Sequence, residues 1–118
     1  MNTQITLASK SQTRSRLLTN AKIKFKTVDH GVDEDEIKLS MSDSSPEEIV
    51  TKLAEMKALK ASMSNDGLVI GSDQGLDLNG KLVNKAKNFD EAHEQLKSMS
   101  GKEHTLITVS YTHLTLPT

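Results

Sequence analysis

The stretch VIGSDQGLDLNGKLVNK, residues 69–85, contains an apolar run that ends at an aspartate and is followed by a tight turn. The run LVIGSD (68–73) predicts a strand, and its nearly continuous apolar side chains are typical of a strand covered on both faces. Asn79 and Gly80 separate the short segments GLDL and KLV, and Asn-Gly favours a hairpin because both residues accept positive φ angles. The sequence therefore predicts a strand that presents Asp73 at its end, followed by a hairpin.

Strands and helices alternate along the rest of the chain. Alternating apolar and polar side chains predict strands at 5–9, 23–28 and 104–109. Helices are predicted to follow the N-cap residues Ser11, Ser45 and Asn88, and Gly101 is expected to end the last of them. The polar, acidic segment 29–44 predicts a loop. This order indicates the α/β class, with a mixed, twisted sheet and flanking helices.

The helices have apolar faces that we expect to be buried. Leu17, Leu18 and Ala21 form this face in the first helix. In the second helix, Pro46 stands in the first turn and Glu48 completes a capping box with Ser45. The third helix has Glu91 at the capping-box position, and its expected buried face consists of Phe89, Ala92, Leu96 and Met99.

Composition excludes several classes of protein. The chain has 118 residues, enough for one domain, and a formal net charge of −1, so no broad basic surface is present to bind nucleic acid. Cysteine is absent, which excludes disulfides and thiolate metal sites. The N-terminus lacks the pattern of a signal peptide, and no apolar run approaches membrane-spanning length. We expect a cytoplasmic protein that binds neither nucleic acid nor membrane.

Two groups of polar residues are candidates for binding an anion. Ser9, Ser11 and Arg14 lie where a strand leads into a helix, and exposed N–H groups and hydroxyls at such a turn attract anions. The simpler alternative is an ordinary helix cap with a surface arginine. Lys57 falls inside the apolar face of the second helix, so it either extends to the rim of that face or points at a negative group.

Carboxylates form the other candidate groups. The acidic stretch DEDE, residues 33–36, would hold Mg²⁺ or Mn²⁺ together with phosphate oxygens, or it is simply solvated. Asp73 lies at a predicted strand end, and Lys85 lies near the end of the hairpin. Asp73 is a candidate for a general base, or alternatively it only forms a hydrogen bond within a turn. Together, the hydroxyls, cations and carboxylates describe a triphosphate site. The two common glycine-rich phosphate loops, GxxxxGK[ST] and GxGxxG, do not occur.

Several segments resemble one family in their order and spacing. LASKSQTRSRLL, VDE, SPEEIVTKLAEMKA, LVIGSDQ and NGKLVNKAKNFDEAHEQLKSMSGKEHTLIT are similar to the Maf family of nucleoside triphosphate pyrophosphatases over residues 5–108. The resemblance implies a Maf/ITPase-like fold and cleavage of a nucleoside triphosphate to a monophosphate and pyrophosphate. It also implies a divalent cation, Mg²⁺ or Mn²⁺, and a house-cleaning role against modified nucleotides. We expect the full-length parent protein to form a homodimer.

The resemblance also assigns roles to individual residues. It implies that Asp73 is the general base and that Glu34 and Asp73 hold the metal. The residues implied in binding substrate and its phosphates are Ser9, Ser11, Arg14, Lys57, Gln74 and Lys85. The step GSDQ resembles the branch that prefers 7-methyl-GTP. The chain departs from the family at Gln12 and Thr13, where SPRR has proline and arginine, and at Asn84 and Ala86, where GKP has glycine and proline.

The last residues do not continue this resemblance. Family members are longer, so residues 1–108 are expected to be the N-terminal portion of a Maf-like domain whose C-terminal half is absent. Residues 109–118, VSYTHLTLPT, resemble a translated sequencing adapter and are predicted to be a non-native tail. Two alternatives to an enzyme remain open. The chain is a non-catalytic module that binds nucleotides or a cell-division protein, or it is an inactive truncated fragment.

Overall fold

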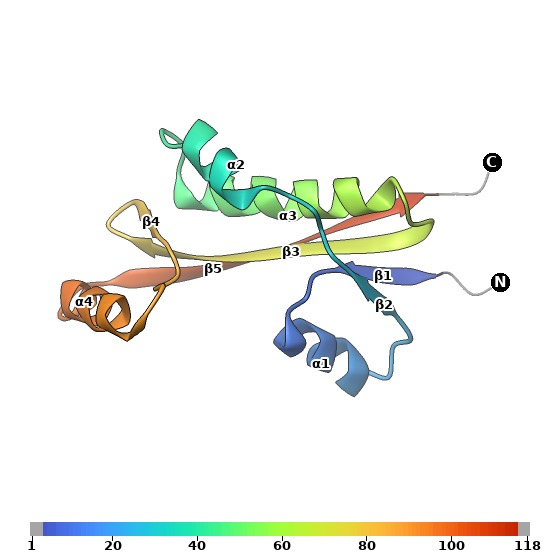
Figure 1. Cartoon of the computed structure of the whole chain (residues 1–118), viewed down its shortest axis with the longest axis horizontal. Coiled ribbons are helices and arrows are strands. Elements are labelled where there is room, and N and C mark those ends of the chain that lie inside the picture. The colour runs from blue at the N-terminus through green and yellow to red at the C-terminus, as the bar shows by residue number, and fades with distance from the viewer. Residues whose placement is uncertain (1–3, 116–118) are drawn as a thin grey trace.

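The computed structural model describes residues 4–115 and contains a mixed sheet with helices on both faces (Figure 1). In chain order the elements are β1 (Ile5–Ala8), α1 (Gln12–Asn20), β2 (Lys26–Val28), α2 (Glu34–Ser40), α3 (Pro46–Ser62), β3 (Gly67–Leu78), β4 (Lys81–Val83), α4 (Phe89–Met99) and β5 (His104–Thr115). The α/β class and the mixed sheet predicted from the sequence are confirmed.

Strand β3 organises the sheet. On one side it pairs with β1 through Leu68–Ile70, in parallel, and with β4 through Leu76–Leu78, as an antiparallel hairpin. On its other side β5 pairs antiparallel along its whole length, and β2 joins the sheet through β1 in parallel. The predicted hairpin at Asn79 and Gly80 is confirmed, since both residues have positive φ angles. The strand before it and the first arm of the hairpin are one continuous strand.

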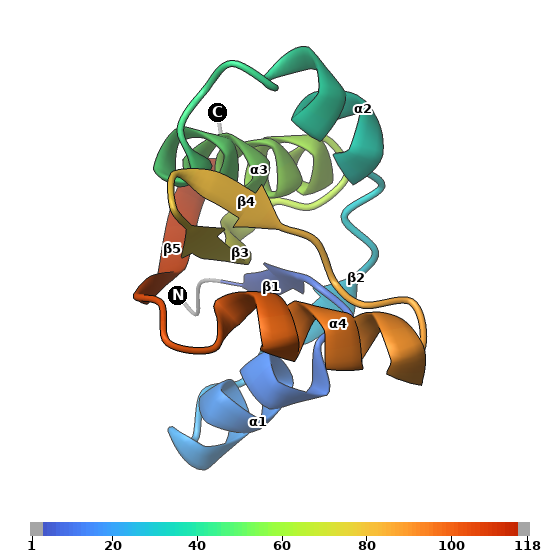
Figure 2. The ribbon, with the colours of Figure 1, turned by 90° about the vertical axis from the view of Figure 1, so that its left-hand side faces the viewer.

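The core lies between the sheet and α3. Helices α2 and α3 lie on one face of the sheet, and α1 and α4 on the other (Figures 1 and 2). A cluster of small buried residues joins the two layers: Ala8, Ala58, Ala61 and Val69. Gly71 permits the close approach, because a Cβ there would meet the carbonyl oxygen of Ala54 and lie 2.6 Å from the amide nitrogen of Ala58. The helix therefore rests directly on the backbone of β3.

The segment 29–44, predicted to be a loop, contains helix α2, so that prediction is wrong. Asp33 caps the helix by accepting a hydrogen bond from the backbone N–H of Glu36 at 3.1 Å. Acidic side chains fill the first turn and Lys38 lies in the last, which suits the helix dipole at both ends. The acidic run that looked like a solvated loop is therefore a helix start.

The predicted buried faces of α1 and α4 are not buried. Within Gln12–Asn20 and Phe89–Met99, all of which the structure describes, no residue is classed as buried. Leu17 is 65% exposed, Leu96 67% and Phe89 90%. The N-caps Ser11 and Asn88 are confirmed, but Glu91 accepts from the N–H of Lys87 in place of the cap residue. The apolar pattern of both helices is typical of helices with a buried face. Within residues 4–115, no other element covers these faces.

Strand β5 crosses the boundary expected at residue 108. Half-buried and exposed residues alternate from Leu106 to Thr115, and Tyr111 packs against the core cluster. That residues 109–118 have a non-native origin stays a prediction. The last three residues of this segment, 116–118, lie outside the described part of the chain.

We predict that Gly71→Ala lowers the free energy of unfolding by roughly 1–3 kcal/mol, because the added methyl group forces α3 away from β3. Urea unfolding followed by circular dichroism would measure this. Thr108→Ala, at an exposed position of β5, is the matched control and should change stability little. An unchanged unfolding midpoint in Gly71→Ala would contradict the close approach.

We also predict that Thr6→Val raises the free energy of unfolding by about 1 kcal/mol. The Thr6 hydroxyl is fully buried and has no hydrogen-bond partner among the described residues, so its removal leaves no other group unpaired. Thr105→Val, at an exposed position, is the control in the same unfolding assay. A loss of stability in Thr6→Val would show that the hydroxyl has a partner.

Candidate functional site

The candidate site lies at the edge where the parallel strands end. Strands β1, β2 and the first part of β3 run in the same direction. The register pairs Leu7 with Ile70. Continued by two residues, this register places Ser9 opposite the residue that precedes Asp73. The segment after β2 leads from the same edge into α2. Side chains distant in the sequence therefore meet at one edge of the sheet.

Lys57 links two carboxylates at this edge. It lies on the buried face of α3, and its side chain is only 5% exposed. Its Nζ lies 2.7 Å from Oε1 of Glu34 and 3.0 Å from Oδ1 of Asp73. Of the two alternatives for Lys57, the structure supports the one in which it points at negative groups. The ammonium connects α3, the start of α2 and the middle of β3.

The charge of Lys57 acts on the carboxylate of Glu34. Partial burial raises the pKa of Glu34, but the hydrogen bond from Lys57 and the positive charges of Lys57 and Lys38 outweigh it, so the pKa is lowered overall. The anion is therefore the favoured form of Glu34 beside the ammonium. A buried lysine is stable here because two anions compensate its charge.

The turn between β1 and α1 forms a second part of the site. Ser9 is 4% exposed, and its Oγ accepts hydrogen bonds from the N–H of Ser11 at 3.1 Å and from Nη1 of Arg14 at 3.2 Å. Oγ of Ser11 accepts from the N–H of Arg14 at 3.3 Å and caps α1. The guanidinium of Arg14 is thus held over the start of its own helix, where the helix dipole also favours an anion.

The segment after β2 brings His30 to the site, a residue that the sequence motifs did not single out. Nδ1 of His30 accepts a hydrogen bond from the N–H of Val32 at 2.9 Å, which fixes the ring. Burial and the nearby charge of Lys57 lower the pKa of His30, while Glu34, Asp29 and Asp73 partly oppose this. The lowered pKa favours the neutral imidazole of His30 beside the carboxylates. Its place just after a parallel strand is the signal that would have found it.

Side-chain contacts hold this segment in place on both sides. Asp29 forms an ion pair with Lys10 at 3.4 Å, which ties the segment to the β1–α1 turn. On the other side, the carbonyl oxygen of Gly31 accepts a hydrogen bond from Nζ of Lys60 on α3. Gly31 has a φ of 67°, a conformation that favours glycine. The two parts of the site are therefore connected through the end of β2.

Gln74 and Lys85 are not drawn into this cluster. Gln74 follows Asp73 directly, so its side chain points to the opposite face of the sheet, and it is exposed. Lys85 is exposed in the connection between β4 and α4. Within residues 4–115, no ion pair or hydrogen bond connects either side chain to the carboxylates. Their roles stay predictions.

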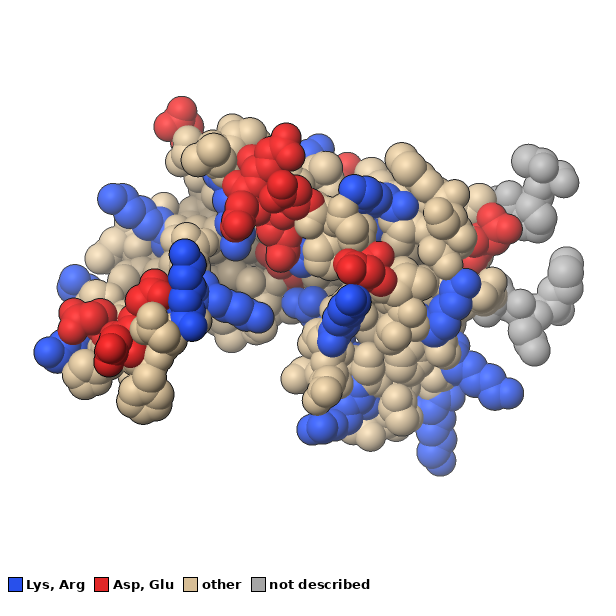
Figure 3. Space-filling model, viewed as in Figure 1, with Lys and Arg blue, Asp and Glu red and all other residues tan. Residues whose placement is uncertain are grey.

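The carboxylates match one way in which proteins bind Mg²⁺. Among residues 4–115, no group of three or more histidine, cysteine, aspartate or glutamate residues is placed to hold a metal ion. Mg²⁺ commonly uses one or two carboxylates and completes its coordination with substrate phosphates and water. Glu34 and Asp73 supply two oxygens around one cation, the Lys57 ammonium. The donor set therefore suits a cation that arrives with a polyphosphate, and Figure 3 shows an acidic surface over α2.

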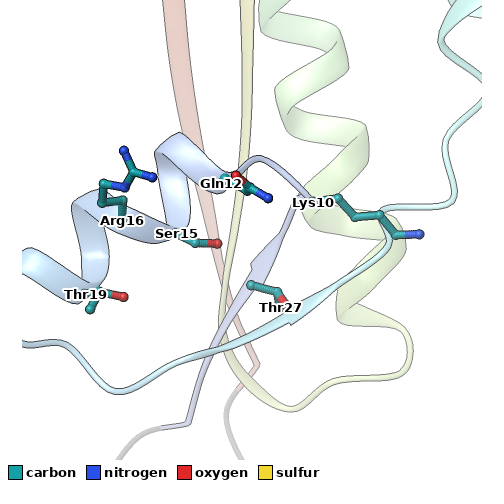
Figure 4. A pocket seen from close by; sticks show the side chains of 6 residues that line it. All are labelled: Lys10, Gln12, Ser15, Arg16, Thr19 and Thr27. Carbon is teal, nitrogen blue, oxygen red and sulfur yellow. The ribbon is translucent and has the colours of Figure 1, made fainter.

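Two pockets of the described surface are lined by other residues than this cluster. One, of about 350 Å³, lies between α1 and β2 and is lined by Lys10, Gln12, Ser15, Arg16, Thr19 and Thr27 (Figure 4). Another, of about 510 Å³, lies along the start of α3. Neither is lined by Glu34, Lys57 or Asp73. We place the site by its chemistry, because three charged side chains from three elements converge there.

We predict that Ser9→Ala lowers the free energy of unfolding by about 1 kcal/mol, because the N–H of Ser11 and the guanidinium of Arg14 lose their acceptor. Chemical unfolding would measure the change. Thr13→Ala, at an exposed position of α1, is the control. Equal midpoints for Ser9→Ala and the wild type would argue against a preformed turn.

No helix within residues 4–115 is both long enough and apolar enough to cross a membrane. The sequence is similar to that of a nucleoside triphosphate pyrophosphatase from Caulobacter vibrioides, at 47% identity over 106 residues, which cover 88% of this chain and 53% of that protein. It is 40% identical over 109 residues to a 7-methyl-GTP pyrophosphatase from Brucella abortus, covering 90% of this chain and 55% of that protein. The chain spans about half the length of the curated relatives it matches.

One solved structure, that of the Staphylococcus aureus Ham1 protein, aligns with a TM-score of 0.47 and 16% identity over 92% of this chain and 70% of that one. At that score the likeness supports no further conclusion. The sequence profile of one family, described as Maf-like protein, matches residues 4–115. This match includes the Ser9 turn, Glu34, Lys57 and Asp73, and it extends to the end of β5. The chain belongs to the Maf-like protein family.

Proposed function

We propose that this chain carries the phosphate-binding and metal-binding residues of a nucleoside triphosphate pyrophosphatase. One observation supports this most strongly. Glu34, Lys57 and Asp73 meet within hydrogen-bond distance at the end of the parallel strands, next to the Ser9–Arg14 turn. The names of the Caulobacter and Brucella relatives point to the same reaction class.

In this proposal Asp73 is the general base. Its side chain is 13% exposed and lies on a buried stretch of β3, so the carboxylate is fixed in place but is not fully closed off from water. The carboxylate accepts a proton from water as the water oxygen bonds to the α-phosphorus. The bond between that phosphorus and the bridging oxygen breaks, and pyrophosphate leaves with the bonding electrons. The products are a nucleoside monophosphate and pyrophosphate.

The other residues bind and neutralise the phosphates. Arg14 and the hydroxyls of Ser9 and Ser11 offer donors at the start of α1, and Lys57 adds an ammonium beside Asp73. Glu34 and Asp73 would hold Mg²⁺ or Mn²⁺, which supplies further charge neutralisation for the phosphates. Gln74 and Lys85 complete the proposed substrate-binding set: Gln74 directly follows the proposed base, and Lys85 is exposed in the connection after β4.

The substrate proposal is a modified nucleoside triphosphate, with 7-methyl-GTP as the first candidate. It rests on the GSDQ step, residues 71–74, and on the name of the Brucella relative. Removal of such nucleotides from the pool is a house-cleaning role, and we place it in the cytoplasm. A homodimer of the longer protein remains part of the same proposal. The net charge of −1 argues against nucleic acid as a partner.

Nucleotide binding without turnover is the second candidate function. The observation that favours it is the position of Lys85, which no ion pair or hydrogen bond within residues 4–115 links to the carboxylates. The neighbouring Asn84 and Ala86 also differ from the family pattern. Binding of a triphosphate that is not followed by release of pyrophosphate would support this candidate over the first.

We predict that Asp73→Asn reduces pyrophosphate release by roughly 10²–10⁴-fold, because asparagine keeps the shape of the side chain but cannot accept the proton. Release would be measured with a panel of triphosphates that includes 7-methyl-GTP. The assay uses this chain and, in parallel, the Caulobacter relative with the matching substitution, since the chain spans about half of that protein.

Asp66→Asn, at an exposed position before β3, is the matched control and should leave release unchanged. If Asp73→Asn kept full activity in a protein that folds normally, Asp73 would not be the base. If no triphosphate yielded pyrophosphate with either wild-type protein, the enzymatic proposal itself would fail.

A further inference from the structure

The ammonium of Lys57 lies between two carboxylates. Its Nζ contacts one oxygen of Glu34 and one of Asp73, at 2.7 and 3.0 Å. These are the two carboxylates that the proposed function assigns to a divalent cation, so the inference rests on that assignment. Two cations cannot both occupy the space between the same pair of oxygens. We propose that Lys57 is a built-in competitor of the divalent cation, holding Glu34 and Asp73 together until the cation displaces its ammonium.

The charges at the site favour this exchange. One ammonium compensates only one of the two carboxylates, whereas a divalent cation compensates both. The side chain of Asp73 is 13% exposed and that of Glu34 39%, so water screens the remaining negative charge only in part. Without a cation, Lys57 lowers the cost of keeping two carboxylates close together. When a divalent cation binds, the contact of Lys57 with the two carboxylates must be broken first.

The lysine side chain is suited to leave. It carries a compact charge on a flexible four-carbon stem, so the ammonium can move several ångströms while α3 stays in place. Burial in an apolar helix face makes a free ammonium unfavourable, so Lys57 needs a new anion when it moves. A phosphate at the neighbouring Ser9–Arg14 turn would supply one. Cation binding and phosphate binding are then coupled, each strengthening the other.

The experiment measures Mn²⁺ binding to the 118-residue chain in the absence of any nucleotide, by the electron paramagnetic resonance signal of free Mn²⁺. In Lys57→Met, which keeps the length of the side chain and removes its charge, we expect Mn²⁺ to bind about tenfold or more tightly than in the wild type. Equal or weaker binding in a folded Lys57→Met protein would overturn the proposal.

Two further variants show where the effect arises. Lys60→Met removes another lysine from α3, one that bonds the carbonyl oxygen of Gly31 and neither carboxylate, and should bind Mn²⁺ as the wild type does. Adding Glu34→Gln to Lys57→Met should abolish the gain. If Lys60→Met gained as much as Lys57→Met, the effect would be a general one of net charge, and the proposal would fail.

Removal of Lys57 leaves two carboxylates facing each other, so a second variant guards against loss of the fold. Lys57→Gln keeps a hydrogen-bond donor near both carboxylates and also removes the charge. Its melting temperature should rise more on addition of Mn²⁺ than that of the wild type, because Mn²⁺ binds the folded state more tightly. An equal rise in the two proteins would count against the exchange.

The result is separable from the proposed function. The readout is cation binding without substrate, so a tighter Lys57→Met site supports the exchange even if no triphosphate is hydrolysed. Conversely, full pyrophosphatase activity together with unchanged Mn²⁺ affinity in Lys57→Met and an equal thermal response in Lys57→Gln would overturn the exchange alone.

Discussion

The contact between α3 and β3 is the constraint on which the site depends. Gly71 has no side chain, and the helix rests on the strand backbone at that point. Asp73 lies two residues further along β3, on the same face, and Lys57 projects from the same buried side of α3. The distance of 3.0 Å between the two charged groups therefore follows from the packing of small residues. A larger side chain at Gly71 would separate Lys57 from Asp73 as well as loosen the core.

The parallel part of the sheet assembles the remaining groups. Because β1, β2 and β3 run in the same direction, the residues that follow each strand arrive at one edge. The β1–α1 turn brings Ser9 and Arg14, and the segment after β2 brings His30 and Glu34. This is the usual place for a ligand site in an open α/β sheet. The antiparallel strands β4 and β5 contribute no residue to the charged cluster but support β3 over its length.

Features that depend on local sequence were predictable. The caps at Ser11 and Ser45 and the hairpin at Asn79 and Gly80 follow from short patterns, and the structure contains them. That Lys57 points at negative groups was one of two alternatives. A helical wheel shows on which face of the helix a lysine lies, but not which group it contacts. That Glu34 and Asp73 share one ammonium could not be predicted, since it depends on how α2 sits on α3.

The errors have a common physical cause. Periodicity identifies an apolar face but does not tell whether another element covers it. Leu17, Phe89 and Leu96 satisfy the pattern and are exposed in the described structure. The acidic run at 33–36 was predicted to be a loop because it is polar. Its negative charges lie in the first turn of α2, where they stabilise the start of the helix. His30 was overlooked because a single histidine carries no spacing.

The one-sided core has a consequence for the dynamics of the site. Lys57 and Asp73 belong to the packed layer of α3 and β3, whose amide groups should exchange with solvent only on large-scale opening. Arg14 belongs to α1, in which no residue from Gln12 to Asn20 is buried, so this helix can fray at little cost. The site thus combines a rigid part, with Lys57 and Asp73, and a more flexible part, with Arg14 on α1. Such an arrangement lets one half keep its geometry while the other adapts to the length and charge of the bound molecule.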